Sequence, residues 1–329
     1  MIKKINCVLL SVILCFYFAA CSRDKKEYSE KQFFVMDTLF TLRIYGEDAD
    51  TQTHFVRVNE LLCEIEAVLS RTVEGSDISR INEARTATDL SSHTLAVLSA
   101  AAEVMQLTDS AYLPTMGAIT DLWSAAGETN ALPDGAQLSA ALTEARKGFL
   151  LEDGTCTLLG EGSLLDLGGI GKGYAADCVL SYLKQANVMG ALLSFGSSVA
   201  TLGEKENGEP FLISLRHPRD PNGTVGMLTD PQGVLSVSGD YERYVTVGGT
   251  KYHHVLDPES GYPADSGLAS VAVICEQGVY SDALSTAFLV MGRVKAEALL
   301  ASDILDADAV FVTADGACHA TSNIPFTPS

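Results

Sequence analysis

The order in which strand-like and helix-like patterns follow one another restricts this chain to a small set of folds. Short β-type runs separated by turns occupy the region from Ala191 to Cys275, and helical periodicity is confined to segments before and after it. A parallel α/β sheet requires strands and helices in regular alternation, because each parallel connection needs a crossover. This sequence lacks such a repeat. It therefore predicts an α+β fold with mixed, largely antiparallel sheets and packed helices.

The spacing of apolar residues predicts the individual elements. Alternation predicts one strand over residues 33–45, with an apolar face formed by Phe34, Met36, Phe40, Leu42 and Ile44. Helical spacing predicts helices over residues 51–70, 92–107, 173–186 and 281–300, with Ser92 as the cap of the second. A last strand is expected at residues 309–313. We expect residues 109–134, which contain two prolines and two glycines, to be irregular.

Charge and composition limit the class of ligand. The 329-residue chain has 42 acidic and 22 basic residues, a formal net charge of −20, and 47% apolar residues. This composition supports a substantial core and excludes a wholly disordered chain. The acidity argues against nucleic-acid binding, which needs a positive field. A phosphorylated ligand would therefore have to be held by local groups, such as a metal ion, backbone amides or one lysine.

The first thirty residues predict export. Lys3 and Lys4 precede an apolar run over residues 8–20, which is too short to span a bilayer comfortably and is typical of a signal peptide. The run ends at Cys21 and resembles the signal of bacterial lipoproteins, in which cleavage leaves that cysteine to carry lipid. We expect a signal peptide at 1–20, a polar tether at 21–31 and a single folded domain at 32–329. The protein would then be a membrane-anchored lipoprotein facing the periplasm or the cell exterior; a simple signal peptide with an incidental cysteine is the alternative.

A glycine-rich segment indicates a ligand site. Residues 166–177 read DLGGIGKGYAAD, and the four glycines of this segment let backbone atoms approach a ligand closely. The helix expected to follow would present its N-terminal amides to an anion, and Lys172 would add a positive charge. The segment is not a Walker A loop, because a glycine follows the lysine. A tight strand-to-helix turn with a surface lysine is the alternative interpretation.

Two further segments contain residues suited to catalysis and metal binding. Residues 253–263 read HHVLDPESGYP, and adjacent histidines on a strand point to opposite faces, so one of them can act as an acid or base. A hairpin with solvent-facing histidines is the alternative. Residues 281–287 read SDALSTA at the start of a predicted helix, where Asp282 and Thr286 would share one face and suit Mg²⁺. Helix capping by Ser or Asp would explain the same residues without a metal.

Together, these segments resemble the ApbE family of flavin transferases, the FAD:protein FMN transferases. The resemblance covers residues 33–292 and is strongest at 166–177, 238–244, 253–263 and 281–292, with weaker matches at 36–38 and 76–82. It implies an ApbE-like fold and an exported enzyme that uses Mg²⁺ and takes FAD as its substrate. Such an enzyme moves FMN onto a threonine hydroxyl of an exported redox protein, such as an ion-pumping electron-transfer subunit, and releases AMP.

The resemblance also implies roles for individual residues. The metal ligands would be Asp282, Thr286 and the carbonyl of Gly169, with help from Ser285. FAD contacts are implied at Met36, Ala111, Tyr112, Leu113, Asp166, Lys172 and Leu256. His254 would lie close to the transferred phosphoryl group and act as the base for the acceptor threonine.

Several positions depart from the usual pattern of the family. Asp37 stands in place of a glycine, Tyr112-Leu113 in place of Phe-Asp, and Arg71 in the region of a usual aromatic residue. These differences concern flavin binding more than the metal site. The sequence leaves two other functions open. One is an Mg²⁺-dependent FAD pyrophosphatase, in which water replaces the threonine, and the other is a flavin-binding lipoprotein without catalysis.

Overall fold

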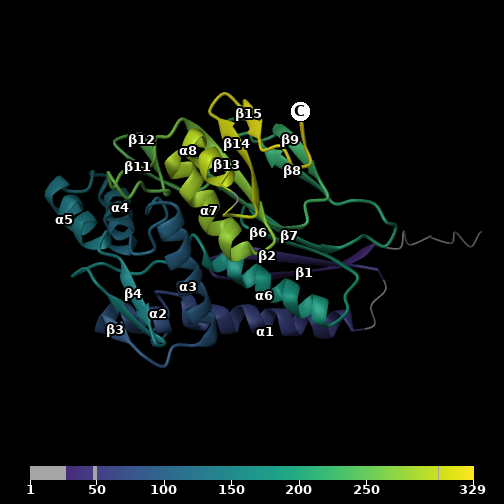
Figure 1. Ribbon diagram of the computed structural model, residues 1–329, viewed down its shortest axis with the longest axis horizontal. Helices are drawn as coiled ribbons and strands as arrows, with labels where there is room; N and C mark the ends of the chain where they lie inside the picture. Colours follow the sequence, from purple (N-terminus) through teal and green to yellow (C-terminus); the bar gives the residue numbers. More distant parts are fainter. Residues whose placement is uncertain (1–26, 47–49, 303) are drawn as a thin grey trace, which may run out of the picture.

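The computed structural model describes residues 27–46, 50–302 and 304–329 (Figure 1). The predicted signal peptide and Cys21 lie outside the described residues. Within them the fold is α+β, as the sequence predicts, and neighbouring strands of the sheets run antiparallel. No helix in these ranges has both the length and the apolar composition needed to cross a membrane.

An eight-stranded sheet forms the centre of the molecule, with its strands in the order β1-β2-β6-β7-β10-β13-β14-β15. The strands are β1 (Tyr28–Val35), β2 (Thr38–Tyr45), β6 (Gly190–Phe195), β7 (Ser198–Gly203), β10 (Gly233–Gly239), β13 (Leu268–Cys275), β14 (Ala307–Thr313) and β15 (Cys318–Ala320). Successive residues of the central strands enter different cores: Val271 and Val273 pack on one face, and Ala272 on the other. Because both faces are covered, β13 is apolar at every position except Ser270 and does not alternate with polar residues.

Helices cover one face of this sheet (Figure 1). They are α1 (Thr51–Leu69), α3 (Ser92–Leu107), α6 (Gly171–Gln185), α7 (Gly278–Met291) and α8 (Arg293–Leu300). α7 packs directly on β10 and β13, and α6 lies between α7 and α1. The apolar residues whose spacing predicted α1, including Val58, Leu62 and Ile65, are all buried in the core beneath it.

Smaller sheets and helices complete the fold. A three-stranded sheet of β8 (Leu212–Arg216), β9 (Thr224–Thr229) and β16 (Phe326–Pro328) packs on the other face of the central sheet. α2 (Asp77–Ala84) adjoins a sheet of β3 (Thr86–Ala87), β5 (Thr155–Leu158) and β4 (Phe149–Glu152). α4 (Gly117–Thr129), α5 (Gly135–Ala145) and the hairpin of β11 (Tyr244–Val247) and β12 (Thr250–His253) enclose a second apolar core around Trp123.

The predicted strand over residues 33–45 is instead a hairpin. β1 and β2 are joined by the two residues Met36 and Asp37, and Val35 pairs with Thr38. This reversal changes the parity of the buried positions, so odd residues such as Phe33 are buried on β1 whereas Phe34 is 76% exposed. The prediction of a single apolar face was therefore wrong for the first half of the segment.

Other boundaries also differ from the predictions. Residues 109–134 are not wholly irregular, because α4 occupies half of them. The helix predicted over 281–300 begins at Gly278 and is divided at Gly292, whose φ of 77° is incompatible with a helix. The cap of α3 is Ser91, whose hydroxyl accepts the Thr94 amide, and not Ser92. Residues 28–31, assigned to the tether, form the first half of β1.

Candidate active site

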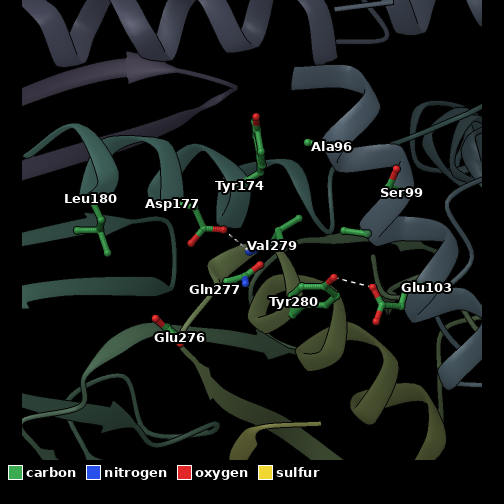
Figure 2. Close-up of a pocket in the computed structure, with 11 residues that line it drawn as sticks. Ala96, Ser99, Glu103, Tyr174, Asp177, Leu180, Glu276, Gln277, Val279 and Tyr280 are labelled. Carbon is green, nitrogen blue, oxygen red and sulfur yellow. Dashed lines mark hydrogen bonds between the residues drawn. The ribbon is translucent and has the colours of Figure 1, made fainter. Parts of the chain in front are cut away.

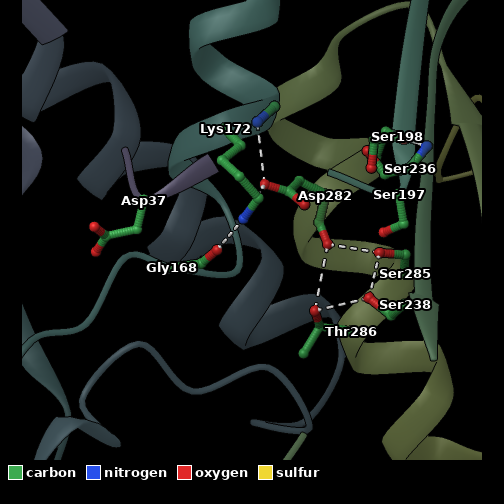
Figure 3. Close-up of polar contacts among 12 residues, drawn as sticks. Asp37, Gly168, Lys172, Ser197, Ser198, Ser236, Ser238, Asp282, Ser285 and Thr286 are labelled. Carbon is green, nitrogen blue, oxygen red and sulfur yellow. Dashed lines mark hydrogen bonds and ion pairs between the residues drawn. The ribbon is translucent and has the colours of Figure 1, made fainter. Parts of the chain in front are cut away.

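Two of the predicted segments, residues 166–177 and 281–287, meet where the N-terminus of α6 contacts α7. Figure 3 shows Lys172 of α6 beside Asp282 of α7, with Thr286 one turn further along α7. Ser238, near the end of β10, faces Thr286 in the same view. Three elements distant in sequence, α6, α7 and β10, thus place a cation, a carboxylate and hydroxyls next to one another.

Two glycines allow α6 and α7 to approach closely enough to form this arrangement. A Cβ at Gly173 would lie 2.0 Å from the carbonyl oxygen of Gly278, and one at Gly278 would lie 2.6 Å from the carbonyl oxygen of Gly173. Neither position has space for a side chain. Gly173 therefore serves helix packing, a role different from the direct approach to a ligand expected for the glycine-rich segment.

The close packing also brings the Asp282 carboxylate to the start of α6. Its Oδ2 accepts a hydrogen bond from the Gly173 amide at 3.0 Å and lies 4.0 Å from Lys172 Nζ. Lys172 Nζ donates to the carbonyl of Gly168 at 2.5 Å, which holds the ammonium over the glycine-rich loop. Asp282 is only 7% exposed, so its charge is stabilised by an amide and a nearby cation instead of by bulk water.

A second carboxylate, Asp177 of α6, determines where α7 begins. It accepts hydrogen bonds from the amides of Gly278 (2.5 Å) and Val279 (2.9 Å), the first two residues of α7. Figure 2 shows Asp177 with Tyr280 and Glu103 around a cavity of about 400 Å³ between α3, α6 and α7. The lining of this cavity contains none of the predicted site residues. Asp177 thus acts at a distance, by holding the helix that carries Asp282.

A chain of hydroxyl groups extends from Asp282. Ser285 Oγ donates to the Asp282 carbonyl at 2.9 Å and lies 2.8 Å from Ser238 Oγ, which is 3.3 Å from Thr286 Oγ1. Ser238 was not among the predicted site residues. It does fall within the motif at residues 238–244, and that motif was the only signal for it in the sequence.

The oxygen donors of this cluster fit a magnesium ion. No group of three or more His, Cys, Asp or Glu side chains in the described part of the chain is arranged to hold a metal, so a metal here would need mixed oxygen ligands. Asp282 offers a carboxylate and Thr286 a hydroxyl, and a Cβ at Gly169 would lie 3.4 Å from Thr286 Oγ1, which places the Gly169 backbone beside that hydroxyl. Mg²⁺ binds a few hard oxygens of this kind and takes its other ligands from water and phosphate.

The hairpin turn between β1 and β2 forms another side of the site. Met36 and Asp37 both have positive φ, 53° and 51°, as a two-residue turn of this type requires. The Met36 amide donates to Glu66 Oε1 at 2.7 Å, and a Cβ at Gly171 would lie 3.3 Å from Met36 Cε. Met36 is therefore positioned next to the N-terminus of α6. Asp37 adopts the turn without the conformational freedom of a glycine.

Asp166 links the glycine-rich loop to the loop after α3. Its amide donates to the Pro114 carbonyl at 2.8 Å, and its Oδ1 accepts from the Gly168 amide at 2.9 Å. Arg71 Nε lies 3.4 Å from Asp166 Oδ2, and the same guanidinium is paired with Asp121. Arg71, which stands in the region of a usual aromatic residue, thus neutralises a carboxylate at the predicted FAD site.

The two leucines assigned to FAD lie in the second apolar core. Leu113 is buried there, and Leu256 packs against the same cluster. Trp123 closes this core and donates from Nε1 to the carbonyl of Gly261 at 2.7 Å, which holds the turn that follows Leu256. Ala111, the other residue of the predicted loop contact, packs on the main core.

His254 presents one nitrogen to the protein and retains the other as a base. Its Nδ1 lies 3.2 Å from the carbonyl of Arg243, which can only accept, so Nδ1 carries the proton and Nε2 keeps a lone pair. Part of His254 is exposed to solvent. Burial of the rest of the residue, together with the positive charges of Arg243 and Lys172, lowers the pKa of His254 to about 4. His253 Nε2 lies 3.0 Å from the carbonyl of Ala264, so the two histidines have different partners. His253 is the last residue of β12 and His254 follows it, so the two are not adjacent residues of one strand, contrary to the prediction from the sequence.

Comparison with known proteins identifies the family. A family model described as the ApbE family matches residues 36–311. This chain belongs to the ApbE family. Among its ApbE relatives, the FAD:protein FMN transferase of Klebsiella pneumoniae (strain 342) is 33% identical over 296 residues, covering 88% of this chain and 90% of the relative. The FAD:protein FMN transferase of Treponema pallidum (strain Nichols) is 31% identical over 351 residues, covering 98% and 96%.

Solved ApbE structures share the fold. The ApbE protein of Thermotoga maritima MSB8 superposes with a TM-score of 0.81 at 30% identity, covering 90% of this chain and 97% of that protein. The flavin transferase ApbE of Vibrio cholerae gives a TM-score of 0.78 at 24% identity, covering 90% and 97%. The ApbE-like α+β fold predicted from the sequence is therefore confirmed.

Proposed function

We propose that this ApbE-family protein transfers FMN from FAD to a threonine hydroxyl of a partner protein and releases AMP, in a reaction that depends on Mg²⁺. The observation that carries the proposal is the meeting of Asp282, Thr286 and Lys172 where α6 and α7 touch. The negative charge of a pyrophosphate has to be stabilised by a metal cation and by nearby donor groups. In this cluster Asp282 and Thr286 are ligands for the metal, and Lys172 is a donor. The names of the relatives, FAD:protein FMN transferases, support the same reaction.

The reaction exchanges one phosphorus–oxygen bond for another. The threonine Oγ forms a bond to the phosphorus on the FMN side of the pyrophosphate, the bond from that phosphorus to the bridging oxygen breaks, and AMP leaves with the bridging oxygen. Asp282, Thr286 and the Gly169 carbonyl would hold Mg²⁺, which when bound neutralises phosphate charge and stabilises the leaving group. Lys172 adds a positive charge on the α6 side of the site.

His254 accounts for the proton of the acceptor hydroxyl. A threonine hydroxyl is a poor nucleophile, so removal of its proton as the new bond forms speeds the reaction. The Arg243 carbonyl holds the ring with Nε2 unprotonated, which is the state a base requires. Met36, Asp166 and the segment 111–113 would bind the nucleotide, and Leu113 with Leu256 would supply apolar contact.

We also propose where the enzyme works. The N-terminal sequence supports export and attachment to a membrane through a lipid on Cys21. The acceptors would then be exported redox proteins, with ion-pumping electron-transfer subunits as candidates. Growth with a radiolabelled fatty acid should label the natural chain but not a Cys21→Ser variant, and equal labelling of both would contradict the anchor.

A direct assay tests the transfer. The purified domain is incubated with FAD, Mg²⁺ and an acceptor protein that carries a short threonine-containing flavinylation motif. Covalent gain of the FMN mass on the acceptor, measured by intact mass spectrometry, is the expected result. Free FMN and AMP without an adduct would show a pyrophosphatase instead, and unchanged FAD would leave only a carrier.

Asp282→Asn tests the metal site with the least disturbance. The amide oxygen can still accept the Gly173 amide, whereas the negative charge that would bind Mg²⁺ is lost. We expect transfer to fall by at least about 100-fold, in line with the several kcal/mol that a catalytic metal contributes. Asp315→Asn, in the turn between β14 and β15, is the matched control and should retain full activity. Undiminished transfer by Asp282→Asn would exclude Asp282 as a ligand.

A further inference from the structure

The hydroxyl group of Tyr112 is a buried donor with no acceptor. Tyr112 is 4% exposed, and its Oη finds no hydrogen-bond partner among the described residues. Most buried hydroxyls in proteins are hydrogen-bonded, because a donor removed from water without a partner destabilises the fold. Such an exception is informative when it lies at a ligand site.

The backbone around Tyr112 is held firmly. Asp109 and Ser110 have positive φ, 49° and 63°, and reverse the chain after α3. The Ser110 amide donates to the Met105 carbonyl at 2.8 Å, and the Tyr112 amide donates to Thr108 Oγ1 at 3.2 Å. These bonds to the end of α3 set the direction of the side chain, so the position of the ring is a property of the loop.

The ring lies directly against the predicted metal site. A Cβ at Gly169 would lie 3.4 Å from Tyr112 Cε2 and 3.4 Å from Thr286 Oγ1, so Tyr112 and Thr286 lie on the same side of Gly169. The hydroxyl is also close enough to Asp166 and Asp282 to feel both charges. Tyr112 therefore lies next to Gly169 and Thr286, two of the proposed metal ligands, and within electrostatic range of Asp166 and Asp282.

A tyrosine hydroxyl is a neutral O–H donor at neutral pH, because an ordinary phenol loses its proton only at about pH 10. Among the described residues, the Tyr112 hydroxyl donates to neither Asp166 nor Asp282, so its proton is available to a ligand.

We propose that the Tyr112 hydroxyl donates a hydrogen bond to a pyrophosphate oxygen of FAD. This inference rests on the proposed function and adds a specific donor to it. Among the groups of FAD, an anionic oxygen next to the metal is the acceptor that best suits a donor placed beside Gly169 and Thr286. A metal ion is a poorer partner, because a protonated phenol presents its hydrogen to the site.

Tyr112→Phe tests the proposal, since it removes only the hydroxyl. Affinities for FAD and for ADP, which shares the pyrophosphate, are measured by calorimetry in Mg²⁺ buffer without acceptor. We expect both dissociation constants to rise about tenfold, as for loss of a hydrogen bond to a charged group. Without ligand, the variant should melt at the same temperature as the natural protein or higher, because an unsatisfied buried donor has been removed.

Tyr174→Phe is the matched control. Its hydroxyl already bonds to His93 Nδ1 at 2.9 Å, so this variant should lose thermal stability and keep its affinity for FAD. Unchanged FAD affinity in Tyr112→Phe, or weaker FAD binding with unchanged ADP binding, would overturn the assignment to pyrophosphate while leaving the transferase intact. A natural protein that does not bind FAD would overturn both.

Discussion

At the scale of single residues, hydrogen bonds determine which atom of His254 is available for chemistry. The Arg243 carbonyl accepts from Nδ1, so the proton of the neutral ring is confined to that nitrogen. Lys172 and Arg243 add positive charge nearby, and both disfavour the imidazolium form. The ring is therefore neutral across the physiological range without needing a carboxylate partner.

This leads to a prediction about pH. Because the free protein holds the pKa of His254 at about 4, below the ordinary 6.5, its basic form persists as pH falls through the range in which most histidines titrate. We expect kcat/KM for FAD to show no acid limb from His254 between about pH 8 and pH 5.5, because kcat/KM reports groups of the free enzyme. The profile is compared with that of His254→Gln. An acid limb near pH 6.5 that disappears in the variant would contradict the assignment.

At the scale of elements, the contact between α6 and α7 builds the site. Gly173 and Gly278 let the first turns of α6 and α7 pack backbone against backbone. This packing places the Gly173 amide where it donates to the Asp282 carboxylate. Asp177 holds the first turn of α7 in the same contact. The metal site is therefore sensitive to the distance between two helices as well as to the identity of its ligands.

Gly173→Ala should disturb this contact. The new Cβ would meet the Gly278 carbonyl oxygen at 2.0 Å, so one helix has to move. We expect the free energy of unfolding to fall by about 3 kcal/mol, the upper part of the usual range for overpacking, and transfer to be lost with it. Gly135→Ala is the control, since a Cβ there meets nothing within 4 Å and should leave stability equal or slightly higher. Urea unfolding followed by circular dichroism measures both, and equal stabilities would refute the proposed role of the glycine pair.

Asp177 should make the stability of the helix contact depend on pH. Burial raises the pKa of Asp177 to about 6 from an ordinary 3.8, so the folded protein binds this proton more tightly than the unfolded chain. Its contribution to stability is therefore greatest below pH 3.8 and is lost as pH rises toward 6. Asp177→Asn does not titrate at this position. Between pH 7 and pH 5, the stability of the natural protein relative to Asp177→Asn should rise by about 1 kcal/mol, and a constant difference would contradict the raised pKa.

At the scale of the whole molecule, the protein is acidic and its proposed substrate is an anion. The chain has a net charge of −20, and the cations of the site, such as Lys172 and Arg243, act over a short range. Long-range repulsion should therefore slow the approach of FAD, and salt screens long-range repulsion more than contacts inside the site.

The association rate of FAD should accordingly rise with ionic strength. Between about 20 and 300 mM NaCl, where the Debye length falls from about 20 Å to about 6 Å, we expect an increase of roughly twofold to fivefold. Stopped-flow quenching of flavin fluorescence measures the rate at constant Mg²⁺. A rate that falls with added salt would mean that the local positive charge of the site dominates the field.

What sequence patterns determine well are features set by nearby residues. The four-residue spacing of Asp282 and Thr286 places them on one face of α7, and the apolar spacing of α1 predicts its buried face. The order of elements was enough to predict an antiparallel α+β fold. These properties depend on local helix geometry and on the length of connections, and both can be read from the sequence of neighbouring residues.

Which helix and strand faces pack against one another was decided only by the tertiary structure. Gly117 and Gly127 made residues 109–134 look irregular, yet a Cβ at Gly127 would meet Val245 at 3.0 Å, so this glycine lets α4 pack closely on β11. Ser238 and the hydroxyl of Tyr112 reach the site through strand order and loop conformation. The motif at residues 238–244 and the resemblance at residues 111–113 pointed to these segments, but not to the hydroxyl–hydroxyl contact of Ser238 or to the unpartnered hydroxyl of Tyr112. Long-range packing determines their places, because a site of this kind forms where separate elements touch, and the distances between them are not encoded in any single segment.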